Sequence, residues 1–170
     1  MLLAVKIMLA FNAIFFFLSG YWGFVETIWV SDGIIIQPHL YAGFFTVCIT
    51  CAIHSIVMFY FIGSGKILKE ALLENYPDYF NENVYPMIRA SKSKVFSWGT
   101  LSVLAMVFAG ILGGAVSAGK VSSEVHLISI LIATWITVKS FVYVLDFVKM
   151  NAEIMDSSAD FIDNQQKITA

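Results

Sequence analysis

Three histidines are the residues of this chain best suited to chemistry. They are His39, His54 and His126, and the imidazole ring is both a common metal ligand and the side chain that titrates near neutral pH. His39 and His126 each stand near the start of a long apolar run, and His54 follows His39 by fifteen residues. If both runs are helices crossing a membrane in the same direction, His39 and His126 lie at one depth and His54 lies about 22 Å deeper.

Four apolar runs are long enough to position these histidines across a bilayer. The chain has 170 residues, of which 59% are hydrophobic and 13% charged, whereas soluble domains are roughly a quarter charged. A spanning helix needs about 20 apolar residues, and backbone groups in hydrocarbon must be hydrogen-bonded within the segment. The sequence therefore predicts an all-α integral membrane protein, a bundle of four transmembrane helices. The expected spans are 7–30, 39–65, 95–118 and 124–149, with an inner loop at 66–94.

Lysine and arginine are distributed unevenly over the loops. With the N-terminus inside, the inner segments carry eight of these residues and the outer loops carry only Lys120, while Lys139 lies within the fourth span. Because inner loops are enriched in Lys and Arg, we expect both termini to be cytoplasmic. The expected location is the bacterial cytoplasmic (inner) membrane. The net charge of −2 provides no basic field, so nucleic acid is not an expected partner.

The membrane domain is expected to cover residues 1–150, and 151–170 to form a polar C-terminal tail, a short helix followed by coil. The inner loop is too short to hold an enzyme domain, and no nucleophile and base stand in a recognisable arrangement. We therefore expect no catalytic activity from this chain on its own. Chemistry, where it occurs, must lie between the helices.

Two imidazoles that face each other from neighbouring helices are suited to the axial ligation of a b-type haem, and glycines on the flanking helices leave room for the flat macrocycle. His39 and His126 supply such a pair from the second and fourth spans. The glycines of the first and third spans near the same face are Gly20, Gly23, Gly113 and Gly114.

In this architecture the four spans resemble the four-helix-bundle b-type cytochromes of membranes. The resemblance implies one haem b between His39 and His126. It also implies a small subunit or anchor of a respiratory redox complex, which transfers electrons among other membrane subunits and has a quinone as a further candidate partner. The chain departs from that pattern at His54, because the fourth span offers Lys139 and no imidazole at that depth.

The same residues admit other interpretations. His39 and His126 are also compatible with interfacial histidines that hydrogen-bond to loops, or with a zinc, copper or iron site completed by carboxylates. The carboxylates nearest that face are Glu26, Asp32 and Glu124. Deeper in the bundle, His54, Lys139 and Asp146 are candidates for a polar relay that conducts protons or contacts a quinone, or for a hydrogen-bonded cluster that fixes helix packing.

The cysteines and small residues carry weaker signals. Cys48 and Cys51 form C-I-T-C without a following histidine, which excludes covalent haem attachment and leaves packing thiols or a thiolate–imidazole metal site. Ridges of small residues in the third span favour close contact with a neighbouring helix or another chain. The competing functional classes are therefore a cofactor-free accessory subunit that packs against larger membrane subunits, and a proton- or ion-conducting subunit.

Overall fold

The computed structural model describes residues 1–25, 29–31 and 34–169, and gives only the backbone of 29–31, 34–36 and 169. In chain order the described elements are α1 (Leu2–Val25), β1 (Trp29–Ser31), β2 (Ile34–Ile36), α2 (Pro38–Leu72), α3 (Pro77–Tyr79), the π-helical turn η1 (Phe80–Val84), α4 (Tyr85–Ser117) and α5 (Ser123–Thr169). The two strands pair antiparallel, with Trp29 opposite Ile36.

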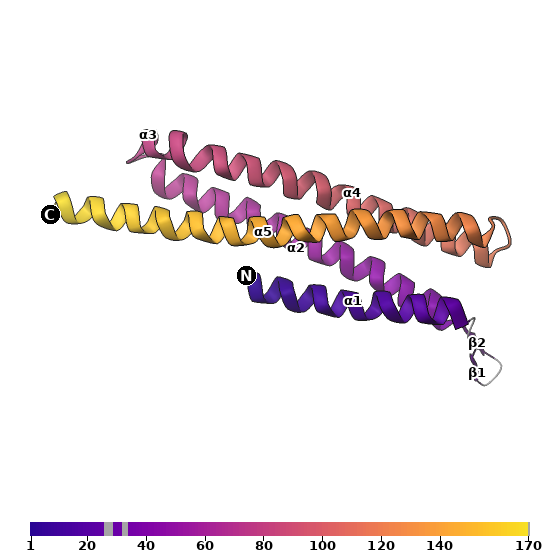
Figure 1. Ribbon diagram of the computed structural model, residues 1–170. Helices are drawn as coiled ribbons and strands as arrows, with labels where there is room; N and C mark the ends of the chain where they lie inside the picture. Colours follow the sequence, from indigo (N-terminus) through magenta and orange to yellow (C-terminus); the bar gives the residue numbers. More distant parts are fainter. Residues whose placement is uncertain (26–28, 32–33, 170) are drawn as a thin grey trace.

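The long helices lie side by side in one elongated bundle (Figure 1). Helix α1 packs on α2, α2 packs on α4 and α5, and α4 packs on α5. One end of the bundle carries the strand pair and the turn between α4 and α5, and we call it the hairpin end. The opposite end, which carries α3 and the end of α5, is the C-terminal end. Helices α2 and α5 both start at the hairpin end and run towards the C-terminal end.

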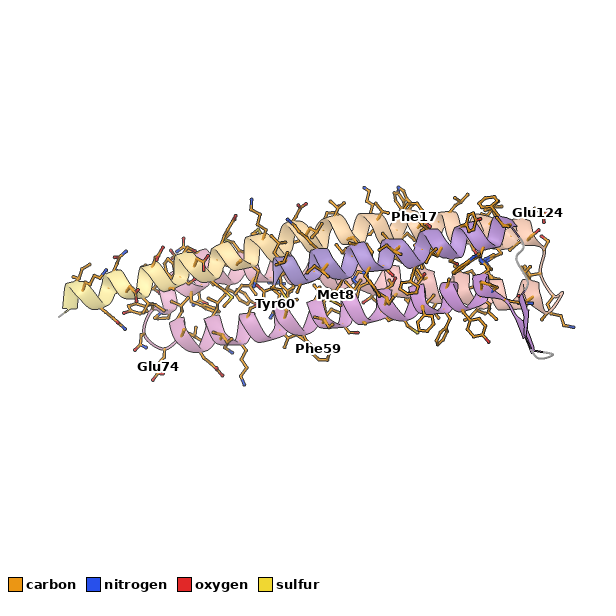
Figure 2. All side chains as sticks on the ribbon, turned by 90° about the horizontal axis from the view of Figure 1, so that it is seen from below. Met8, Phe17, Phe59, Tyr60, Glu74 and Glu124 are labelled. Carbon is orange, nitrogen blue, oxygen red and sulfur yellow. The ribbon has the colours of Figure 1, made fainter. Side chains whose placement is uncertain are left out.

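Within the described residues, four helical segments are long and apolar enough to cross a membrane: α1, α2, α4 with the turns before it, and α5. Their outer surface is apolar, as lipid contact requires. Phe17 and Phe59 are 75% and 72% exposed, and Figure 2 shows both on the outside of the bundle. The predicted all-α, four-helix membrane bundle is confirmed.

The helix boundaries differ from those expected. Helix α1 begins at Leu2 and ends at Val25, so the first helical span is shifted towards the N-terminus. The expected inner loop, 66–94, is mostly helical, because α2 continues to Leu72 and α4 begins at Tyr85. The expected coil near the C-terminus is also absent from the described residues, since α5 continues without a break to Thr169.

A seam of inward-facing residues explains these extensions. Buried positions recur every three or four residues along α2, α4 and α5, which is the spacing of left-handed helix bundles. On α5 the buried positions are Ala133, Thr137, Ser140, Val144, Val148, Asn151, Ile154 and Ser158. The seam therefore passes position 150 without a change of register. At the C-terminal end it joins a separate apolar cluster of Leu68, Leu72, Phe80, Val84, Ile88 and Ile154.

Each long helix begins or ends with a recognisable signal. Pro38 occupies the first turn of α2, where its missing N–H removes no helix hydrogen bond. Helix α4 ends in a Schellman turn, in which the Lys120 N–H donates to the Ala115 carbonyl and the Gly119 N–H to the Val116 carbonyl. Gly119 has φ of 67°, a conformation that glycine adopts without a steric penalty. This turn brings the start of α5 back beside the start of α2.

Candidate functional site

The start of α2 and the start of α5 position the two shallow histidines. His39 follows Pro38 in the first turn of α2, and His126 lies in the first turn of α5, which starts at Ser123. Because both helices begin at the hairpin end, the two side chains lie at one level, as the sequence indicated. Both are half-buried. We call His39 and His126 together the histidine pair.

The two imidazole rings face each other across the α2–α5 interface. Their centroids are 6.1 Å apart and their planes are inclined at 76°. Two imidazole nitrogens that bind one metal ion at the usual distance of about 2.0–2.1 Å place their ring centroids about 6 Å apart. The separation of the rings is compatible with one ion shared between nitrogens on its opposite sides, and it is also that of an edge-to-face ring contact.

Hydrogen bonding prepares His39 as a ligand. Its Nδ1 atom is 2.7 Å from the carbonyl oxygen of Ser19 on α1. A carbonyl only accepts, so Nδ1 must carry the proton and donate. The lone pair then lies on Nε2, and the same carbonyl fixes the orientation of the ring. Most metal-bound histidines donate their other ring N–H to a carbonyl or carboxylate in this way.

His126 is held differently, by α4. Gly113 on α4 lies against the ring, where an added Cβ would come within 3.0 Å of Cε1. Its Nδ1 atom is buried and has no hydrogen-bond partner among the described residues. A buried nitrogen without a partner is costly and calls for an explanation, of which an absent ion or ligand is one.

Glycines on α1 and α4 lie directly against the two rings. A Cβ atom added at Gly23 would lie 2.8 Å from His39 Nδ1, and one added at Gly113 would lie 3.0 Å from His126 Cε1. At Gly20 and Gly114 an added Cβ would meet nothing within 4 Å, and both residues are exposed. Of the four predicted glycines, two therefore make room for the imidazoles and two face outward.

The predicted carboxylate ligands are not assembled around the pair in the described part of the chain. Glu26 and Asp32 lie outside the described residues. Glu124 is exposed at the hairpin end (Figure 2). Among the described residues, no three His, Cys, Asp or Glu side chains come together as a metal-binding group. The candidate ligands that the described residues provide at this place are the two imidazoles of the histidine pair.

The deeper polar relay is not brought together. His54 is 1% exposed and stacks on Phe141, with ring centroids 5.3 Å apart. Neither ring nitrogen has a partner among the described residues. Lys139 and Asp146 are both exposed on the outer face of α5, so the expected cluster with His54 is wrong. Residues 139 and 146 do share a helix face, but the seam runs along a different one.

The two cysteines also differ in their surroundings. Both are free thiols; Cys48 is exposed on α2, and Cys51 is half-buried. The exposed thiol faces the surface that contacts lipid, so the pair does not form a common buried site.

Sequence analysis overlooked a polar contact that joins α1 to α2. The Asn12 Nδ2 atom donates to Thr50 Oγ1 at 3.1 Å, and both residues are buried. A similar contact joins α4 to α5, where Ser102 Oγ and Thr137 Oγ1 are 2.9 Å apart. An asparagine inside an apolar span was the available signal for the first contact. These hydrogen bonds fix the rotation of each helix against its neighbour, and so they help to aim the histidine pair.

Comparison of the chain with protein-family models, with curated proteins and with solved structures finds no match.

Proposed function

We propose that the protein is a small integral-membrane electron-transfer subunit that binds one b-type haem between His39 and His126. The observation that carries this proposal is the 6.1 Å separation of the two imidazole rings. The Ser19 carbonyl, which orients the His39 ring, supports it. A b-type haem held by two histidines would take His39 and His126 as its protein ligands and would supply one-electron redox chemistry.

The donor set fits this cofactor better than it fits a bare metal ion. Zinc sites usually use at least three protein ligands, and the described residues offer two at this place. Two neutral imidazoles suit iron whose equatorial positions are already filled. When bound, the haem would supply reversible one-electron chemistry between ferric and ferrous iron.

The residues of this chain would hold and tune that cofactor. His39 and His126 would provide the axial nitrogens, and the Ser19 carbonyl would increase the donor strength of His39 through its hydrogen bond. Gly23 and Gly113 keep α1 and α4 close to the rings without displacing them. The half-buried position near the end of the bundle suits exchange of electrons with a partner subunit or a quinone at the membrane surface.

The orientation is part of the proposal. Seven of the ten lysines and arginines belong to the parts of α2, α4 and α5 that lead to the C-terminal end, Lys6 lies near the start of α1, away from the hairpin end, and Lys120 lies in the turn at the hairpin end. The positive-inside rule then places the C-terminal end in the cytoplasm and the histidine pair near the opposite face of a bacterial inner membrane. Single cysteines introduced at each end of the bundle test this assignment, by comparing their labelling with a membrane-impermeant thiol reagent in intact cells and in lysed cells.

The direct test is absorbance spectroscopy of the purified protein, isolated from membranes or supplied with haemin. We expect a Soret band and one haem per chain by pyridine haemochrome assay. Both His39→Ala and His126→Ala should abolish the band, whereas His54→Leu is the matched control and should retain it. A parent protein that binds no haem, or a Soret band that persists in either of the first two variants, would refute the proposal.

A cofactor-free accessory subunit is the second candidate, and the C-terminal end favours it. There α2, α4 and α5 continue beyond α1 and enclose their own apolar cluster, which gives a rigid extension on which a larger subunit could dock. Co-purification from native membranes, compared between the parent chain and a variant truncated after residue 150, tests that role. The proton-conducting alternative is not carried forward, because Lys139 and Asp146 lie on the outer surface, away from His54.

A further inference from the structure

Lys139 is an exposed charge within an apolar span. It is the single Asp, Glu, Lys or Arg between Val125 and Leu145. The side chain lies on the outer face of α5, where the bundle contacts lipid. A charge in that position is costly and is normally paired or drawn to the interface. The surroundings of Lys139 therefore indicate what satisfies it.

Aromatic side chains from two helices surround the ammonium group. Lys139 Nζ is 5.5 Å from the ring centroid of Trp135 on α5 and 6.0 Å from that of Trp98 on α4. Trp98 also packs against Tyr143, with centroids 5.4 Å apart, one turn further along α5. Trp and Tyr are enriched at the membrane–water interface, so this cluster is typical of a position near the lipid headgroups.

No carboxylate neutralises Lys139 within the described part of the chain. The ion pairs found there are Lys66–Glu70 and Lys149–Glu153. Asp146 lies two turns further along α5 and is exposed. Lys94 is also exposed, one turn from Trp98 on α4. The Lys139 ammonium group has no ion-pair partner among the described residues, which favours an anionic ligand.

We propose that Lys139, Trp98 and Tyr143 form a binding site for the phosphate of an anionic phospholipid in the leaflet at the C-terminal end. The Lys139 side chain extends along the protein surface towards the headgroups, as long basic side chains do near helix ends. Its ammonium group binds the phosphate, and the rings of Trp98 and Tyr143 lie beside it. The two indole faces stabilise the cation on its apolar side. This proposal is independent of haem binding.

Tryptophan quenching by brominated lipids tests the site. The chain has four tryptophans, and replacement of Trp22 and Trp29 by Phe leaves Trp98 and Trp135 as the reporters. This protein is reconstituted into phosphatidylcholine vesicles that contain increasing fractions of brominated phosphatidylglycerol, with brominated phosphatidylcholine as the reference. We expect a binding preference for phosphatidylglycerol that falls about five-fold in Lys139→Gln, since one basic residue near the headgroups contributes about 1 kcal/mol.

Two further variants separate a specific site from general charge. Lys139→Arg keeps the cation and should retain the preference. Lys120→Gln removes a lysine at the hairpin end and should leave the quenching unchanged. Equal quenching by brominated phosphatidylcholine in every variant shows that each one is inserted normally. An unselective parent protein, or a Lys139→Gln variant with the full preference, would overturn the proposal.

Discussion

Gly23→Ala is the substitution that most directly tests how the histidine pair is built. The added Cβ would lie 2.8 Å from His39 Nδ1, which is closer than Cβ contacts in proteins come, and ordinary contacts begin at 3.4 Å, so the ring or the helix must shift, by about 0.6 Å if the contact is to become an ordinary one. Metal–ligand distances tolerate deviations of about 0.2 Å. The ring is also held by its hydrogen bond to Ser19. A shift of this size therefore breaks either that bond or the bond to the metal.

Gly20→Ala is the matched control one turn away. An added Cβ meets nothing within 4 Å there, so the substitution should only improve helix propensity, by about 1 kcal/mol. Gly23→Ala receives the same gain but loses a hydrogen bond of about 0.5–1.5 kcal/mol. We expect its free energy of unfolding to remain within about 1 kcal/mol of the parent, while its haem affinity falls at least ten-fold.

Haem content per chain, determined at increasing haemin concentration, measures the effect, and unfolding in a denaturing detergent measures stability. The pair Gly113→Ala and Gly114→Ala repeats the comparison beside His126, with a milder contact of 3.0 Å at Gly113 and none within 4 Å at Gly114. The expected order of haem loss is Gly23, then Gly113, then the two controls. Equal affinity in Gly23→Ala and Gly20→Ala would show that the His39 ring, in the position described, is not a ligand.

Three other substitutions test the packing around the site. Thr50→Val removes the acceptor of Asn12 and should lower the free energy of unfolding by about 0.6–1.7 kcal/mol; no change would show that the contact is immaterial. His54→Leu removes two buried nitrogens without partners and should leave the melting temperature unchanged or raise it, so a clear decrease would contradict the described environment. Phe161→Ala removes a ring stacked 3.8 Å from Tyr79 and should accelerate amide exchange at the C-terminal end alone; faster exchange near the histidine pair would contradict this.

The fold was predictable from the lengths of the apolar runs, because a run of about 20 apolar residues in a bilayer has few stable conformations other than a helix. The helix ends were less predictable. Residues 66–94 and 151–170 have a polar composition, and the buried residues that hold them in the bundle include Ser158 and Asn151, which composition alone assigns to solvent. The seam becomes visible only when their three- and four-residue spacing is followed from within the span. A periodicity test extended beyond position 150 would have found it.

The depth of the candidate site in the bundle could be predicted from the sequence, but the rotation of each helix about its own axis could not. Counting residues from the start of each span placed His39 and His126 at one depth, since both helices begin at the same end. The sequence does not state which way each helix turns about its axis. For this reason Lys139 was expected beside His54, whereas it lies on the outer face. The Ser19 carbonyl was also beyond prediction, because backbone groups leave no signal in side-chain patterns.

The unbroken course of α2 and α5 has a mechanical consequence. These helices carry the two imidazoles at one end, and both reach past the N-terminal helix at the other (Figure 1). Helix α5 alone has 47 residues and is about 70 Å long. Close-packed helices transmit strain along their length. A partner that tilts the protruding ends of α2 and α5 would therefore change the angle between the two helices. That change would alter the distance between the His39 and His126 rings at the hairpin end.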